Sequence, residues 1–245
     1  MAHDTSPRRA ARRVSLSQRR ALVTRTTRLQ PLRDIPSIRL HLAADAEAVT
    51  RATAAALGVD EAPLPYWAFA WSGGLAIARY LAEHPEEMTS RTVLDLATGS
   101  GLCAIAAMQA GAATVTGVDI DPFAEAAVDL NAKANGVRVG YIGRDLLDDE
   151  PPDVDVILAG DTSYEGPFAE RVGPWLRRAA ARGTRVLVGD PGRRYLPTTD
   201  LVEVAAYEVH TTTAFEDRDV VTARAFTLPA RSTSPPVQAP ESSER

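Results

Sequence analysis

Short apolar runs alternate with amphipathic stretches through the middle of the chain. Apolar runs that predict buried strands lie at 92–97, 114–120, 154–160 and 185–189, with a weaker run at 139–142. Stretches with apolar residues at helical spacing lie between them, at 102–110, 122–134 and 168–181. Because strands that alternate with helices form a mostly parallel sheet with helices on both faces, the pattern predicts an α/β fold.

The pattern changes towards the end of the chain, where two strand patterns follow each other without a helix. They cover 202–212 and 220–228, and a short charged turn at 216–219 joins them. Two strands joined this closely pair antiparallel. The sequence therefore predicts a Rossmann-like, seven-stranded, mostly parallel sheet that ends in a C-terminal antiparallel hairpin.

The two ends of the chain lack this periodicity. Residues 1–30 carry eight arginines against the single acid Asp4, so we expect a disordered basic arm there. Its composition also resembles that of a transit peptide. Residues 31–228 are expected to form the folded domain, and the Pro/Ser-rich residues 229–245 a disordered tail.

The first part of the expected domain contains a strand at 38–42, a helix at 46–57 and a helix at 75–83. An aromatic segment lies before the second helix. Trp67 and Phe69 are expected in the core. Trp71 precedes Ser72-Gly73-Gly74, and because glycines at a helix start permit close approach of a ligand, we expect its indole to wall a pocket.

The charge distribution narrows the choice of partners. The chain has a net charge of −5, and because the arm carries +7, the remaining residues carry −12. An acidic body prefers a basic partner and disfavours nucleic acid. No apolar run approaches the roughly 20 residues that span a bilayer, so no membrane partner is expected.

Cysteine and histidine are sparse. The single cysteine, Cys103, allows no intrachain disulfide, and we expect it to be a packing residue. Four scattered histidines and one cysteine do not make a zinc site, so no metal is expected. The composition fits a cytoplasmic protein, or one of the mitochondrial matrix if the source is eukaryotic.

The first strand of the repeating pattern runs into the turn Asp95-Leu-Ala-Thr-Gly99-Ser-Gly101. Gly99 and Gly101 permit close approach of a ligand, and the N-terminus of the following helix points at it. Asp119, at the end of the next strand, can accept hydrogen bonds from two ribose hydroxyls. This arrangement suits both NAD and S-adenosylmethionine.

Three features favour S-adenosylmethionine over a dinucleotide. Three residues separate Asp95 from Gly99, whereas a dinucleotide site has its first glycine at the strand end. A carboxylate at Asp95 would repel a pyrophosphate but receive the ammonium of a methionine moiety. The antiparallel hairpin is the third feature. After the third strand, Asp145 is either a hydrogen-bond acceptor for the adenine amino group or part of an ordinary solvated loop.

The fourth strand ends in Gly160-Asp161-Thr-Ser-Tyr164. Ligands of open α/β sheets bind outside the carboxyl ends of the strands, so Asp161 and Tyr164 are expected where a methyl group meets its acceptor. A carboxylate suits an amine, which it holds by charge-assisted hydrogen bonds. An enclosed site lowers the pKa of lysine and so populates the neutral nucleophile.

These motifs support a family resemblance. The pair Asp161 and Tyr164 resembles the D/E-x-x-Y/F signature of the lysine-directed seven-strand methyltransferases known as family 16. This chain also resembles one branch of that family, the electron transfer flavoprotein β-subunit lysine methyltransferases. The segments that carry this resemblance are 65–74, 93–96, 119–122 and 189–193. Ala97 stands where that family usually has glycine.

The resemblance implies a role for each candidate residue. S-adenosylmethionine would be the cofactor, Trp71 and Gly160 would also line its pocket, and Asp161 and Tyr164 would be catalytic. The electron transfer flavoprotein β subunit would be the substrate. Four alternatives stay open: a small-molecule N- or O-methyltransferase, a ribosomal protein L11-type methyltransferase, a non-catalytic binding module, and a dehydrogenase.

Overall fold

The computed structural model describes residues 13–197, 199–211 and 219–229. Its main sheet has seven strands in the order β5-β4-β3-β6-β7-β9-β8. The strands are β3 (Thr92–Leu96), β4 (Thr114–Val118), β5 (Gly140–Ile142), β6 (Val156–Gly160), β7 (Arg185–Asp190), β8 (Val202–His210) and β9 (Val220–Leu228). The strands β3 to β7 pair in parallel, and β9 pairs antiparallel with both β7 and β8. The predicted fold is confirmed, hairpin included.

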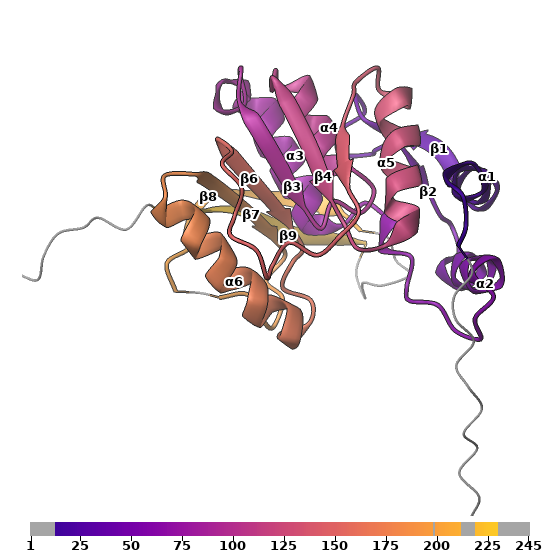
Figure 1. Cartoon of the computed structure of the whole chain (residues 1–245). Coiled ribbons are helices and arrows are strands. Elements are labelled where there is room, and N and C mark those ends of the chain that lie inside the picture. The colour runs from indigo at the N-terminus through magenta and orange to yellow at the C-terminus, as the bar shows by residue number, and fades with distance from the viewer. Residues whose placement is uncertain (1–12, 198, 212–218, 230–245) are drawn as a thin grey trace, which may run out of the picture.

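Helices cover both faces of this sheet (Figure 1). They are α3 (Ser72–Glu83), α4 (Leu102–Gln109), α5 (Pro122–Ala134) and α6 (Gly166–Ala181), with short 3₁₀ turns η1 (Tyr66–Ala68) and η2 (Pro85–Glu87). Alternate strand residues explain the two layers: Val93 and Leu158 pack with α3 and α4, while Leu94 and Ile157 pack with α6. Because both faces are covered, the parallel strands are mostly apolar, and the buried Asp95 and Asp190 are the exceptions that bear on the site.

The first residues described correct the prediction of a disordered arm over 1–30. A helix, α1 (Leu16–Thr26), and a strand, β1 (Arg28–Pro31), form within that range. Ser15 and Gln18 make a capping box at the start of α1. Arg19 and Arg20 pair with Glu125 and Asp129 of α5, both at 2.8 Å. Two of the arginines on which the prediction of disorder rested, Arg19 and Arg20, therefore attach this segment to α5.

The strand β1 pairs antiparallel with β2 (Arg39–Leu42), and α2 (Ala46–Leu57) follows. Two asparagines of α5 hold β2. Asn131 accepts the His41 N–H at 2.7 Å, and Asn135 bonds both the N–H and the carbonyl of Arg39. The strand thus finds hydrogen-bond partners in side chains where a sheet neighbour is missing. The tail 230–245, the turn residues 216–218 and residues 1–12 lie outside the described residues.

The parallel topology brings the carboxyl ends of β3 to β7 to one edge of the sheet, where ligands of open α/β sheets bind. At that edge α3 lies unusually close to the strands. A Cβ atom on Gly73 would stand 2.1 Å from the carbonyl oxygen of Gly189, and one on Gly160 would stand 3.0 Å from Cα of Gly74. Within the described ranges, no helix combines the length and apolar character needed to cross a membrane.

Candidate functional site

The turn between β3 and α4 is built from left-handed residues. Ala97, Gly99 and Gly101 have φ values of 54°, 51° and 80°. Thr98 donates its backbone N–H to Val118 of β4 at 2.9 Å, and Gly101 donates to Thr98 at 2.8 Å. Gly101 is the N-cap of α4 and provides no side-chain cap. Because Gly101 has no side chain to cap α4, the first N–H groups of this helix are candidates for binding a ligand, apart from that of Ala104, which Asp95 binds.

Asp119 lies beside this turn, as the sequence predicts. Its Oδ2 accepts the Gly99 N–H and its Oδ1 accepts the Asp121 N–H, both at 2.9 Å. A carboxylate has about four lone-pair sites, so each oxygen keeps acceptor capacity. Burial raises the pKa of Asp119, while these N–H groups oppose the rise. The carboxylate is oriented by the protein and still able to accept from two neighbouring hydroxyls.

Ile120 follows Asp119 and is 74% exposed, which is a residue that the sequence reasoning missed. The strand β4 ends in the buried residues Gly117 and Val118, so an exposed isoleucine just beyond them, beside an oriented carboxylate, stands out. A flat apolar group that covers Ile120 while its hydroxyls reach Asp119 has the chemistry of a nucleoside.

Asp95 lies in β3, next to the turn, and its side chain is buried. Its side chain is 1% exposed, and its Oδ2 accepts from the Thr98 hydroxyl at 2.5 Å and the Ala104 N–H at 3.0 Å. Burial raises the pKa of Asp95 to about 7. The carboxylate thus ties the turn to α4 through Oδ2, and its contact with a cofactor stays a prediction.

Asp145 lies in an exposed loop after β5. Its Oδ1 accepts the Leu147 N–H and its Oδ2 accepts from Arg171 of α6, both at 2.8 Å. Burial alone would raise the pKa of Asp145, but these two partners outweigh it and hold the pKa below its usual value. Both oxygens therefore have protein partners, and a bond to an adenine amino group stays a prediction.

Asp161 is the centre of the other half of the site. Its backbone is left-handed, with φ of 53°, which is uncommon for a residue with a side chain. Its Oδ2 accepts the Gly74 N–H at 3.0 Å, so it caps the first turn of α3, whose N-cap Trp71 supplies no side-chain cap. This long-range cap explains why α3 begins at Ser72, three residues before the predicted start. Burial raises the pKa of Asp161 to about 6, although Arg193 lowers it.

The glycines at the start of α3 let this helix lie close to the sheet. A Cβ atom on Gly73 would collide with the backbone of Gly189, and one on Gly160 would press against the backbone of Gly74. Their part in the approach of a ligand stays a prediction. Gly160 is therefore explained by helix packing, and its place in a cofactor pocket stays a prediction.

Three aromatic rings lie on the segments next to Asp161: Tyr66 and Trp71 precede Gly74, which binds Asp161, and Tyr164 follows Asp161 by three residues. The Tyr66 ring lies 5.6 Å from Trp71 and 5.1 Å from Tyr164, measured between ring centres. Tyr66 and Tyr164 are 36% and 40% exposed, while Trp67 and Phe69 are buried as predicted. Burial raises the pKa of Tyr164 to about 12. The sequence reasoning placed Trp71 and Tyr164 at the site and missed Tyr66, which connects them.

The loop after β7 completes this half. Asp190 is fully buried, and its Oδ1 accepts the N–H groups of Gly192 and Arg193 at 2.7 and 2.6 Å. The Arg193 guanidinium donates twice to Oδ1 of Asp161, from Nε at 3.1 Å and Nη2 at 3.0 Å. No site role was predicted for either residue, although their motif at 189–193 signalled the family resemblance.

A hollow of about 730 Å³ lies at the opposite edge of the sheet, lined by the amino ends of β3, β6 and β7. Charged residues there pair with each other, as Arg185 does with Glu87 and Arg91 with Asp155.

Cys103 is buried, as expected of a packing residue, and burial raises the pKa of its thiol well above the usual value. Across the described part of the chain, no three His, Cys, Asp or Glu side chains cluster in a way that would hold a metal ion.

Comparisons with known proteins bear on the family of the chain. The sequence model of the family "Ribosomal protein L11 methyltransferase (PrmA)" matches residues 79–160. The electron transfer flavoprotein beta subunit lysine methyltransferase of Rattus norvegicus is 41% identical over 131 residues, covering 53% of this chain and 51% of the rat protein. The homolog of that enzyme from Caenorhabditis elegans is 31% identical over 186 residues, covering 69% of this chain and 74% of the nematode protein. The chain spans about half the length of the vertebrate relatives that it matches at about 40% identity.

Proposed function

The chain belongs to the family of electron transfer flavoprotein beta subunit lysine methyltransferases, and we propose that it transfers methyl groups from S-adenosylmethionine to a lysine side chain of a protein. The observation that carries the proposal is the pairing of two built sites at one sheet edge. The oriented carboxylate of Asp119 beside the start of α4 suits a nucleoside. The buried carboxylate of Asp161, with aromatic side chains on the neighbouring segments, suits an amine.

The cofactor half fits S-adenosylmethionine. Gly99 and Gly101 form the turn, Asp119 would accept the ribose hydroxyls, and the exposed Ile120 would contact the base. Trp71, Gly160 and Asp145 are further residues that we propose for this pocket. When bound, S-adenosylmethionine supplies a methyl group on a positively charged sulfur, which keeps the electron pair of the broken carbon–sulfur bond.

The acceptor half would hold the lysine. We propose that Asp161 accepts a hydrogen bond from the lysine nitrogen and stabilises the positive charge that develops on it during transfer. Tyr164 and Tyr66 present exposed rings that would contact the lysine stem. Because the methyl acceptor must be the neutral amine, the proton leaves to solvent before the new bond forms.

We propose the electron transfer flavoprotein β subunit as the substrate, because the relatives are named for it. The family model for ribosomal protein L11 methyltransferases matches residues 79–160 and so ends one residue before Asp161. That match therefore covers the cofactor half and says nothing of the acceptor. A cytoplasmic location, or a mitochondrial one in a eukaryote, belongs to the same proposal, as does the absence of nucleic acid, membrane and metal partners.

A labelling experiment tests the function. Purified protein is incubated with tritiated S-adenosylmethionine and the purified electron transfer flavoprotein β subunit of the same organism, and the labelled residue is identified by mass spectrometry. We expect label on a lysine of the β subunit. Label only on a small molecule, or only on ribosomal protein L11 in a whole-cell extract, would contradict the proposal.

A further inference from the structure

Both carboxylate oxygens of Asp161 are occupied by the protein itself. Oδ2 accepts the Gly74 N–H, and Oδ1 accepts two bonds from Arg193. A lysine that approaches Asp161 therefore meets a carboxylate that is already paired with a guanidinium. This matters because an unpaired carboxylate stabilises the ammonium form, and the ammonium form has no lone pair to attack the methyl group.

Arg193 is held from three directions. Its backbone N–H is bound by the fully buried Asp190, and its guanidinium is bound by Asp161. The guanidinium carbon also lies 5.8 Å from the centre of the Trp71 indole. The side chain of Arg193 is 21% exposed against 7% for Asp161, so it stands between the carboxylate and solvent. Three anchors on one arginine indicate a fixed part of the site.

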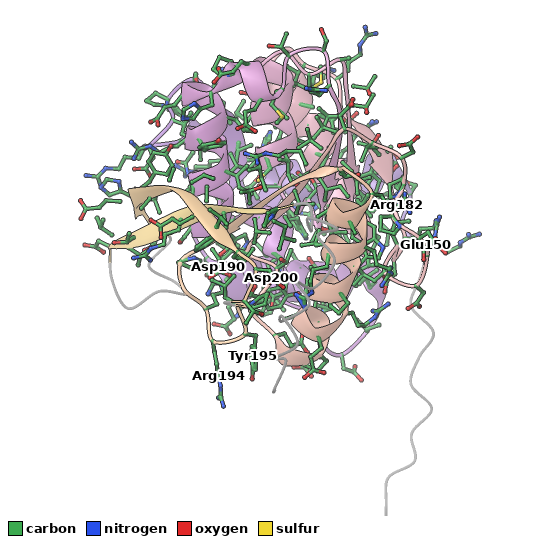
Figure 2. The ribbon with its side chains drawn as sticks, turned by 90° about the vertical axis from the view of Figure 1, so that its left-hand side faces the viewer. Glu150, Arg182, Asp190, Arg194, Tyr195 and Asp200 are labelled. Carbon is green, nitrogen blue, oxygen red and sulfur yellow. The ribbon has the colours of Figure 1, made fainter. Side chains whose placement is uncertain are left out.

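The neighbouring arginine behaves differently. Arg194 is exposed, and its guanidinium carbon lies 5.6 Å from the centre of the Tyr195 ring. Figure 2 shows the side chains of Arg194 and Tyr195 extending outward from the loop after β7. Two adjacent arginines thus share a loop, and one of them is directed into the site.

We propose that Arg193 is a positioning residue for methyl transfer: it fixes the carboxylate of Asp161 and balances its charge, so that the substrate lysine loses its proton more readily. The inference rests on the proposed function. A cation next to an amine disfavours the charged form of that amine, which is one way in which proteins activate lysine. The carboxylate stays able to accept an N–H bond and to stabilise the charge that appears on nitrogen during transfer.

The other charged groups at this place support the role. Asp190 of β7 and Cys103 of α4 interact with Asp161, and Tyr66 of η1 interacts with Arg193. Between β6 and α6, Glu165 acts on Tyr66 and on Tyr164. Burial raises the pKa of the thiol and of both phenols, so these three stay neutral near pH 7. Asp190 adds a second carboxylate next to Asp161 and raises its pKa. Arg193 is the cation that opposes these carboxylates, so its removal would favour the ammonium.

The test is the pH dependence of methyl transfer in charge variants of Arg193. The single-turnover rate on the purified electron transfer flavoprotein β subunit is measured from about pH 5 to about pH 10. Arg193→Met and Arg193→Gln remove the charge, Arg193→Lys keeps it, and Arg194→Met is the matched control. Calorimetric titration with S-adenosylmethionine shows whether each variant keeps a folded cofactor half.

We expect Arg193→Met and Arg193→Gln to lose about tenfold or more in rate at pH 7 and to move the acid limb of the profile upward by about one pH unit or more. High pH restores their rate, Arg193→Lys keeps the limb near that of the wild type, and Arg194→Met changes neither quantity. A purely structural role would lower the rate at every pH without moving the limb.

An unmoved limb in Arg193→Met and Arg193→Gln, with S-adenosylmethionine affinity retained, overturns the inference and leaves the proposed function standing. A wild-type protein that transfers no methyl group to the β subunit overturns the proposed function, and the inference with it. Binding of S-adenosylmethionine by Arg193→Gln keeps the test valid if the methionine variant fails to fold.

Discussion

The two halves of the site are assembled in different ways. In the cofactor half, the contacts join residues close in sequence: Asp95 with Thr98 and Ala104, and Asp119 with Gly99. In the acceptor half, Asp161 binds Gly74, 87 positions away, and Arg193, 32 positions away. One continuous segment, 95–119, thus builds the turn and Asp119 of the cofactor half, whereas the contacts of Asp161 exist only once α3, β6 and the loop after β7 have packed together.

We expect cofactor binding and methyl transfer to be separable in this molecule. The carboxylate of Asp119 binds the N–H groups of Gly99 and Asp121, whereas the carboxylate of Asp161 binds Gly74 and Arg193, so these hydrogen bonds share no residue. Substitutions at sites without shared partners act independently. Variants of one half are therefore expected to leave the other half working.

The largest expected effect belongs to Asp161→Asn. Asparagine tolerates the left-handed backbone and still accepts the Gly74 N–H, but it has no charge for the developing ammonium. We expect the transfer rate to fall at least about 100-fold, the range in which a positioned acid–base group acts. Single-turnover labelling measures it.

Asp200→Asn is the control for that variant, because Asp200 also has a left-handed backbone, with φ of 73°, and an exposed side chain. Its rate should equal that of the wild type. A fall in Asp200→Asn as large as that in Asp161→Asn would show that the loss comes from strain and not from the missing charge.

Asp119→Ala is expected to weaken S-adenosylmethionine binding by about 100-fold. It removes two hydrogen bonds to a charged acceptor, each of which contributes about 1.5 kcal/mol or more. Calorimetric titration measures the dissociation constant, and Asp60→Ala, at an exposed carboxylate beyond α2, is the control. An affinity within threefold or so of the wild type would mean that the ribose lies elsewhere.

Asp95 makes stability depend on pH. Burial raises the pKa of Asp95 to about 7 in the folded protein from its ordinary value of 3.8, so the folded state binds this proton more tightly than the unfolded state does. Protonation of Asp95 therefore contributes to the free energy of unfolding. This contribution is complete below the pKa that Asp95 has in the unfolded chain and is lost as pH rises through about 7. Between about pH 8 and pH 5 the free energy of unfolding should rise by about 2 kcal/mol on account of this group.

Urea unfolding of the wild type and Asp95→Asn at the two pH values checks that contribution. Asparagine can accept from Thr98 and Ala104 but does not titrate. The variant should lack this part of the pH dependence. If the free energy of unfolding depends on pH equally in both proteins, Asp95 does not have the raised pKa that its burial in this structure implies.

Ala97→Gly is the smallest change and should stabilise the protein. Ala97 has φ of 54°, a conformation that costs a residue with a Cβ atom about 1 kcal/mol or more. Relief of that strain should raise the melting temperature by about 2–4 °C. Ala113→Gly, at an exposed alanine outside the left-handed region, should lower it instead. A lower melting temperature for Ala97→Gly would contradict the assignment.

The periodic parts of the fold could be predicted from sequence because local pattern determines them. The helices 46–57 and 122–134 have the predicted ends, and the strands of the sheet lie within a few residues of the predicted ones. The helix α1 could not be predicted, because Arg19 and Arg20 interrupt its apolar pattern. Their partners, Glu125 and Asp129, lie far away in the sequence on α5. Long-range ion pairs leave no period in the sequence.

The site divides in the same way. Gly99, Gly101 and Asp119 could be placed together because a strand–turn–helix segment brings them together by itself. The direction of the Asp95 side chain, the reason for Gly73 and Gly74, and the role of Arg193 depend on contacts between distant segments. For these residues the sequence indicated that they belong to the site motifs but not which distant residues they contact.

A titration of three proteins with S-adenosylmethionine tests the separation of the two halves most directly. The wild type, Asp119→Ala and Asp161→Asn are compared in one calorimetric series. We expect Asp161→Asn to bind like the wild type and Asp119→Ala to bind about 100-fold more weakly. Loss of binding in Asp161→Asn, or wild-type binding in Asp119→Ala, would contradict the account of a cofactor half that works without the acceptor half.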